Sequence, residues 1–288
     1  MSESISLADF WALFGNSIVA ALLAAALCGY LGFFVVLRRL AFVSAALGQI
    51  SGLGVAFGFF LGSYFGVDPH APTPIYLDPV VLALVLTGIA SAALGYVIRV
   101  ERISPESVIA FAYLASTAMA IIILASPRIV QEAHEVGDLL FGNAVAIRRE
   151  HFLELVAVAF AVLCSHAFLF KDLLFVSFDR EMAQAVGLPA TKIDILLHVS
   201  IGISVAAATR AIGALPVFGF LVLPASAALL ASNSVRGVLA LSIAGAMLAA
   251  GGGFYLSFLQ SWPTGPLMVA CAAAYWPLAV LYRIARRS

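Results

Sequence analysis

Long hydrophobic runs, separated by brief polar connections, occupy most of the 288-residue chain. A helix needs about 20 consecutive apolar residues to cross the hydrocarbon core of a membrane. The runs therefore predict an all-α protein, a polytopic transmembrane helical bundle of about nine spans. The expected spans cover residues 10–37, 41–65, 78–98, 105–125, 151–170, 191–209, 212–231, 236–259 and 264–283.

The stretch 212–231 is the least regular of these expected spans. Pro216 and Pro224 interrupt its helical pattern, and Gly213 and Gly219 loosen it. About eight crossings plus a re-entrant segment is therefore the alternative that the sequence leaves open.

Composition supports a membrane protein, and the distribution of charge predicts on which side of the membrane each terminus lies. The chain is 63% hydrophobic and 10% charged, whereas soluble domains are about 45–50% apolar and about 25% charged. An odd number of spans puts the two termini on opposite sides, and most lysines and arginines fall inside if the C-terminus is cytoplasmic. We therefore expect a multi-pass protein of the plasma (inner) membrane, with its N-terminus outside and its C-terminus in the cytoplasm.

Several functional classes are disfavoured by what the sequence lacks. Basic and acidic residues are equal in number, 15 of each, with no long basic cluster, so nucleic acid is not expected as a partner. The motifs His-Glu-x-x-His and Gly-x-Ser-x-Gly are absent, which counts against an intramembrane enzyme. The phosphate-binding motif Gly-x-x-x-x-Gly-Lys-[Ser/Thr] is also absent. The cysteines Cys28, Cys164 and Cys271 lie in apolar stretches without metal-binding spacing, and we expect them to be small buried residues.

The most informative polar stretch covers residues 175–189, on the predicted cytoplasmic side between two spans. Glu181, Ala183 and Gly187 follow the spacing Glu-x-Ala-x-x-x-Gly, which places Ala183 one turn before Gly187 on a short helix. Small residues on one face would let another protein approach closely, and Leu188-Pro189 would end the helix. A plain amphipathic connector is the alternative interpretation of this segment.

Five short motifs carry a family resemblance because they occur in one order along nearly the whole chain. The motifs are Gly32 to Phe42, the Leu-Phe-Gly-Asn within Gly137 to Asn143, Phe178-Asp179, Gly213 to Ala225, and the Pro-Thr-Gly within Trp262 to Pro266. With these motifs in this order, the chain resembles the permeases of ATP-binding-cassette importers for zinc, manganese or iron(II), a class that depends on a binding protein.

The resemblance implies one transmembrane permease domain over residues 1–288, with a cytoplasmic coupling helix near 178–189. It also implies a homodimer, a cytoplasmic ATPase that hydrolyses ATP, and an extracytoplasmic solute-binding protein. This chain would be a transport subunit and not an enzyme, and it would bind no cofactor of its own. The residues that would couple to the ATPase are Phe178, Asp179, Glu181, Ala183 and Gly187.

Two other transport functions remain as alternatives to metal import. One is the same importer class with a different small solute as cargo. The other is a secondary transporter driven by an ion gradient, which normally has acidic or broken-helix ion sites at mid-membrane. The expected spans are nearly free of acids, and this counts against the secondary transporter.

One stretch departs from the family pattern in the region that would meet the cargo. After Arg38-Arg39 the family reads Gly-Asp-Ala-Leu-Ser-His, but here Ala45 replaces the Asp and Gln49 replaces the His. A neutral amide oxygen is a poor ligand for zinc or manganese compared with carboxylate and imidazole. We expect Gln49 and Ser51 to line the translocation pathway, and an interhelical hydrogen bond is the alternative role for Gln49. Zinc or manganese remains the default cargo.

Three further residues near span ends are candidates for function. Asp194 and His198 are four residues apart and share one helix face, so they could hold a proton or contact a metal ion. Alternatively, Asp194 orients its helix and His198 packs near the membrane interface. Arg210 ends a span, and we expect its long side chain to extend to the membrane interface.

A predicted outer loop also contains a cluster of titratable residues. Such a cluster could attract a divalent cation or meet basic residues of a binding protein, and a solvated loop is the alternative. Its members are Glu132, His134, Glu135 and Asp138.

Overall fold

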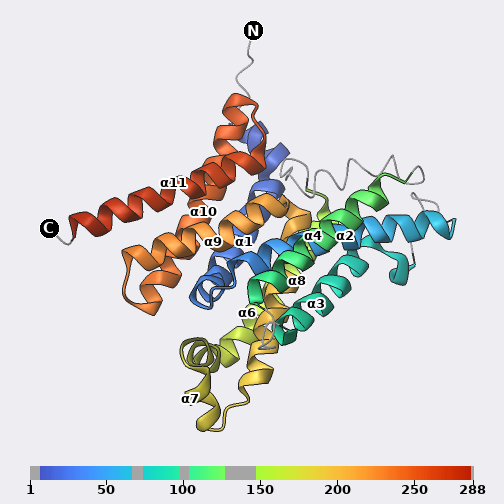
Figure 1. Ribbon diagram of the computed structural model, residues 1–288. Helices are drawn as coiled ribbons and strands as arrows, with labels where there is room; N and C mark the ends of the chain where they lie inside the picture. Colours follow the sequence, from blue (N-terminus) through green and yellow to red (C-terminus); the bar gives the residue numbers. More distant parts are fainter. Residues whose placement is uncertain (1–6, 67–73, 98–103, 127–146, 287–288) are drawn as a thin grey trace.

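The computed structural model describes residues 7–66, 74–97, 104–126 and 147–286. Over these residues the chain is almost entirely helical, and nine of the helices are long and apolar enough to cross a membrane. This confirms the prediction of an all-α transmembrane bundle (Figure 1). The elements are α1 (Leu7–Leu37), α2 (Ala41–Tyr64), η1 (Ile75–Leu77), α3 (Pro79–Val97), α4 (Pro105–Leu124), α6 (Arg149–Phe178), α7 (Arg180–Ala185), α8 (Ala190–Ile212), α9 (Ala214–Ala231), α10 (Val235–Gln260) and α11 (Thr264–Ala285).

The irregular stretch 212–231 forms a single helix, α9. The chain turns at Gly213, whose φ of 90° suits glycine, and the helix then runs for 18 residues through Pro224. Pro216 lies in the first turn, where backbone N–H groups have no intrahelical partner and the missing N–H costs little. At 1.5 Å per residue α9 is about 27 Å long, close to the hydrocarbon thickness. Its length therefore favours a crossing over a re-entrant segment.

Helix α6 continues well beyond the span expected at 151–170. It reaches Phe178, so the start of the polar connector is helical. Leu173 and Val176 are buried in the main core, which explains the extension: one face of these last turns still packs against the protein.

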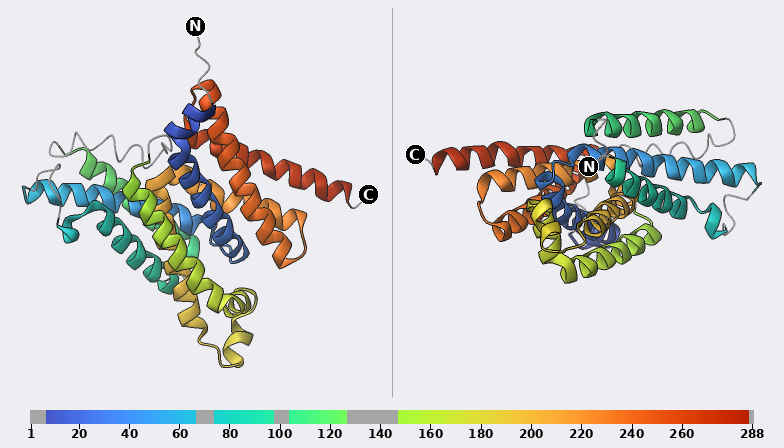
Figure 2. Two further views of the ribbon diagram at one scale, coloured as in Figure 1. Left: turned by 180° about the vertical axis from the view of Figure 1, so that it is seen from behind. Right: turned by 60° about the horizontal axis from the view of Figure 1, so that its bottom comes forward.

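α8 is the central helix of the bundle. It contacts α1, α2, α3, α6 and α9, and most of its apolar window is buried. On one side of it, α1, α9, α10 and α11 pack together, and on the other side α2 contacts α3 and α4 (Figure 2). α6 and α8 run together to one end of the molecule, where α7 joins them.

Helices approach each other closely where glycine removes the Cβ atom. A Cβ on Gly32 of α1 would lie closer than 3.0 Å to the carbonyl oxygen of Leu221 in α9. A Cβ on Gly253 of α10 would meet the backbone of Met268 in α11 in the same way. Such contacts suit a membrane bundle because lipid provides no hydrophobic drive for helices to associate, and close packing must hold them together.

We predict that Gly32→Ala lowers the stability of the folded protein. The new methyl group would push α9 away, and overpacking of this kind costs about 1–3 kcal/mol. The same change at Gly62 of α2 is the control, because no atom lies within 4 Å of the added Cβ. Thermal unfolding of both purified variants in detergent measures the difference, and equal midpoints would contradict the close contact.

Candidate functional site

The short helix α7 lies within the predicted segment, but it ends at Ala185, before Gly187, and not at Leu188-Pro189. Asp179 caps its start, since the carboxylate oxygen Oδ1 accepts a hydrogen bond from the backbone N–H of Met182 at 2.8 Å. At its end Gly187 has a φ of 91°, and the N–H of Leu188 donates to the carbonyl of Ala183 at 3.0 Å. This is a Schellman motif, which requires a left-handed residue and selects glycine. α7 is therefore a rigid, well-capped turn of helix.

The two faces of α7 differ from what the small-residue spacing indicated. Ala183 is 0% exposed and packs within the protein, so its side chain does not meet an outside partner. On the exposed side, Met182 of α7 and Val186 at its C-cap lie one turn apart, and Phe178 is the last residue of α6, before the extended Asp179. Each of these three side chains is more than half exposed. We call these three residues the apolar strip. Met182 and Val186 were missed from sequence, although the four-residue spacing of apolar residues would have signalled them.

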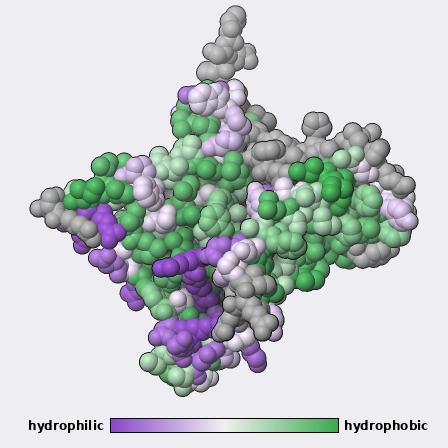
Figure 3. Space-filling model, in the orientation of Figure 1, coloured by the Kyte–Doolittle hydropathy of each residue, from purple (hydrophilic) through white to green (hydrophobic). Residues whose placement is uncertain are grey.

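The apolar strip lies at the polar end of the molecule. Hydrophilic residues gather around α7 and the start of α8, whereas hydrophobic residues cover most of the remaining helices in this view (Figure 3). Glu181, another predicted coupling residue, is exposed on α7 beside the strip. An apolar patch with a polar rim is typical of a surface that contacts another protein.

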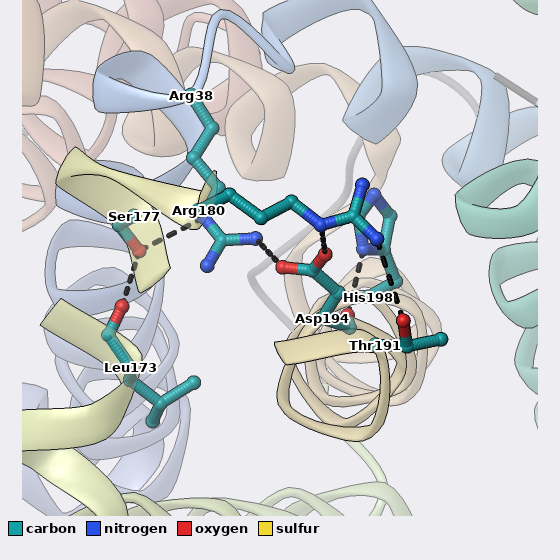
Figure 4. Close-up of polar contacts among 7 residues, drawn as sticks. All are labelled: Arg38, Leu173, Ser177, Arg180, Thr191, Asp194 and His198. Carbon is teal, nitrogen blue, oxygen red and sulfur yellow. Dashed lines mark hydrogen bonds and ion pairs between the residues drawn. The ribbon is translucent and has the colours of Figure 1, made fainter. Parts of the chain in front are cut away.

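Asp194 and His198 share one face of α8, as predicted, but Asp194 is already paired. Its Oδ1 accepts a hydrogen bond from Nη1 of Arg38 at 2.5 Å, and its Oδ2 lies 3.1 Å from Nε of Arg180 (Figure 4). His198 forms a hydrogen bond between Nδ1 and the backbone oxygen of Asp194 at 2.8 Å, and its ring lies against Gly95 of α3. In the part of the chain that the structure describes, no group of three or more His, Cys, Asp or Glu residues could hold a metal ion. Metal contact at this pair stays a prediction.

The predicted pathway residues of α2 lie in different surroundings. Ala45 and Gln49 are half-buried on a stripe of α2 that also carries the exposed Phe42 and Phe57. Ser51 is buried, and its hydroxyl has no hydrogen-bond partner among the described residues. Of the two predicted pathway residues, Gln49 and Ser51, only Gln49 therefore lies on the partly exposed face of α2.

A neighbour of Gln49 was missed from sequence. The hydroxyl of Thr117 in α4 donates to Oε1 of Gln49 at 3.3 Å and also lies 2.7 Å from the carbonyl oxygen of Tyr113. One hydroxyl hydrogen is shared between these two acceptors, so the bond to Gln49 is weak. The pair places neutral oxygen atoms on this face, where the family pattern has a carboxylate and an imidazole.

The prediction that Arg210 extends to the membrane interface is wrong. Its side chain is only 2% exposed and forms an ion pair with Glu154 of α6. Asp78, just before α3, also interacts electrostatically with the guanidinium. The arginine turns inward because carboxylates from neighbouring elements compensate its charge there. Sequence could not show this pairing, since Arg210 and Glu154 are far apart in the chain.

Two predicted features lie outside the described residues. They are the Leu-Phe-Gly-Asn signature within 137–143 and the loop cluster of Glu132, His134, Glu135 and Asp138.

In the part of the chain that the structure describes, nine helices of spanning length with a short capped helix at the polar end form the architecture of a multi-pass membrane protein. A model of the ABC 3 transport family matches residues 11–283, and the chain belongs to this family. The resemblance read from the ordered motifs is therefore confirmed.

Named relatives and a solved structure agree with this placement. The chain is 27% identical over 268 residues to the manganese transport system membrane protein MntC of Halalkalibacterium halodurans, covering 93% of this chain and 86% of that protein. It is also 27% identical to the chelated iron transport system membrane protein YfeC of Yersinia pestis, covering 85% of this chain and 77% of that protein. In the structure of PsaBC from Streptococcus pneumoniae in complex with Fab, one chain has the same fold, with a TM-score of 0.78, 23% identity and 95% coverage of both chains.

We predict that Glu154→Leu strongly destabilises the protein. The change removes the ion-pair partner of the buried guanidinium of Arg210 and leaves only its electrostatic interaction with Asp78, and breaking a buried pair costs about 3–5 kcal/mol. The double variant Glu154→Leu with Arg210→Leu should recover most of the loss, because it removes both charges. Thermal unfolding in detergent separates these cases, and a double variant no more stable than the single one would contradict the pairing.

Proposed function

We propose that this chain is the membrane-spanning permease of an ATP-driven, binding-protein-dependent importer for a divalent transition metal, with manganese or zinc as the default cargo. Membership in the ABC 3 transport family supports the transport class. The relatives named for manganese and for chelated iron support the metal.

The observation that carries this proposal is the apolar strip on α7. A helix of six residues is too short to be stable alone, yet both its ends are capped and its inner face is anchored by Ala183. Such rigidity costs a partner little ordering entropy on binding. Covering Phe178, Met182 and Val186, which are 60%, 53% and 67% exposed, would contribute roughly half of the about 1.5–3 kcal/mol that complete burial of an exposed side chain gives. We assign the strip as the docking surface for a cytoplasmic ATPase, which hydrolyses ATP on behalf of this chain.

Two other partners are inferred from the partly exposed stripe of α2 and from the end of the molecule opposite α7. The open stripe of α2 with Ala45 and Gln49 is one wall of a pathway, and a second copy related by twofold symmetry would supply the opposite wall. An extracytoplasmic binding protein would deliver cargo at the end opposite α7. Placing α7 in the cytoplasm puts the C-terminus inside and the N-terminus outside, as the basic residues favour.

The neutral lining at Gln49 and Thr117 bears on the state of the cargo. A divalent ion stripped of water needs several oxygen or nitrogen donors, and one amide with one hydroxyl cannot supply them. We therefore propose that the ion crosses partly hydrated on this stretch. The same substitution at Ala45 and Gln49 is the observation that favours a second candidate function, in which the importer carries another small solute.

The docking prediction concerns Met182 and Val186 of the apolar strip. Changing both to Glu places charge on the surface that the ATPase would cover, and we expect co-purification of the ATPase and ATP-driven uptake of Mn²⁺ or Zn²⁺ into proteoliposomes both to be lost. Asn233→Glu, which adds charge at the exposed α9–α10 turn, is the control. An intact complex and normal uptake in the double Glu variant would refute α7 as the docking surface.

The cargo prediction restores the family pair on α2. Ala45→Asp with Gln49→His places carboxylate and imidazole one turn apart, a spacing that allows both to contact one ion. We expect the purified dimer of this variant to retain zinc or manganese that the parent does not retain, measured by elemental analysis after dialysis. If the parent already holds one tightly bound metal ion per protomer, and Gln49→Ala leaves that ion in place, the ligands lie elsewhere and Asp194 with His198 are tested next.

A further inference from the structure

Four segments of the chain meet at the carboxylate of Asp194, next to α7. Arg38 comes from the corner between α1 and α2, Ser177 from the last turn of α6, and Arg180 is the first residue of α7 (Figure 4). Nε of Arg38 donates to the hydroxyl of Ser177 at 2.8 Å, while its Nη1 reaches Oδ1 of Asp194. Arg180 reaches Oδ2 of the same carboxylate and also donates to Thr191 at 3.4 Å.

The charges at this junction make Asp194 the shared element. Its side chain is 5% exposed, and its two oxygens are divided between two arginines, one from each side. Burying the carboxylate of Asp194 and its arginine partners costs desolvation energy, which offsets most of the attraction between the charges. The role of this carboxylate is therefore to fix the relative positions of the segments that it joins, more than to add net stability. The Arg180 contact is an ion pair rather than a well-aligned hydrogen bond, and its arginine is 38% exposed. Arg180 is therefore the more exposed and the less closely bound of the two arginines.

The turn that carries Arg38 joins α1 directly to α2, so a displacement of Arg38 would shift the start of α2. The chain turns at Arg39, which has a φ of 59°, and the N–H of Leu40 donates back to the carbonyl of Val35 at 2.7 Å. A non-glycine residue held in the left-handed region is unusual, and it fixes a tight turn with no slack between α1 and α2. Gln49 lies about two turns along α2 from this corner.

A second connection runs from Asp194 to α3. The backbone oxygen of Asp194 bonds to Nδ1 of His198, and the backbone oxygen of His198 accepts a hydrogen bond from Ser91 of α3. Gly95 of α3 also allows close contact with the ring of His198. A shift of α8 at Asp194 would therefore carry both α2 and α3, which form the wall on the Gln49 side.

We propose that Arg38, Asp194 and Arg180 form a clamp that transmits displacement of α7 to α2 and its pathway face. The clamp rests on the proposed function, because α7 moves only if an ATPase engages it. In this role Arg180 and Asp194 are positioning residues, because they act on the pathway through α2 and α3. They decide whether ATP hydrolysis is converted into opening of the pathway.

The test uses the complete importer, purified with its ATPase and reconstituted in proteoliposomes, with Mn²⁺ as the probe. Arg180→Gln leaves the pair of Asp194 with Arg38 and leaves the apolar strip unchanged. We expect the ATPase to remain bound and to hydrolyse ATP, while Mn²⁺ uptake per ATP falls about tenfold, within the usual range of coupling between sites. Lys192→Gln is the matched control, since it removes an exposed cation from the first turn of α8, close to α7 in the chain, and it should not change this ratio.

A double-mutant cycle distinguishes transmission from a general loss of structure. Asp194→Asn should uncouple the importer at least as strongly as Arg180→Gln, and the two changes together should be no worse than Asp194→Asn alone, because both break one contact. If Asp194→Asn does not accumulate in the membrane, Arg180→Lys replaces it in the comparison and should recover part of the lost coupling. Normal coupling in Arg180→Gln, loss of the ATPase from that variant, or an equal effect of Lys192→Gln would each overturn the clamp. If the unchanged chain itself binds no ATPase, the proposed function fails as well.

Discussion

Close approach of helix backbones is the constraint on which the rest of this bundle depends. Lipid solvates apolar side chains as well as another helix does, so association must come from packing at short range. Gly32 against Leu221 and Gly253 against Met268 show how the chain achieves it, by leaving out the Cβ where two helices cross.

Ionic contacts hold the central helix α8 at both ends. Asp194 near its start binds Arg38 and Arg180, and Arg210 near its end binds Glu154. Both systems involve α6 or the segment that follows it, so α6 and α8 are joined at the two ends of their shared length. The two contacts differ in exposure, because Arg210 is fully enclosed whereas Arg180 is partly open. This difference agrees with a rigid contact at the Arg210 end of α8 and a contact that can rearrange at the Asp194 end, beside α7.

The sequence correctly located the short helix α7, but the small-residue face that its spacing indicated is not the exposed one, since Ala183 is buried. The spacing of Glu181, Ala183 and Gly187 correctly located a short helix, but those small residues serve its own structure. Ala183 packs inward, and Gly187 ends the helix in a left-handed conformation. Among the residues of α7 only Ala183 is buried, and the large apolar side chains exposed in and beside this helix are Phe178, Met182 and Val186.

The sequence by itself determined the class of fold, the approximate spans, the family and the position of the short helix, because these depend on local hydrophobicity, spacing and motif order. Span ends were less predictable, since α6 continues to Phe178 on packing that only the folded protein supplies. The tertiary structure alone decided that Arg210 turns inward to Glu154 and that Asp194 is shared between two arginines. It also brought Thr117 to Gln49. These partners lie between 14 and 156 residues apart in the chain, and a charged or polar side chain takes whichever partner the packed backbones bring within reach.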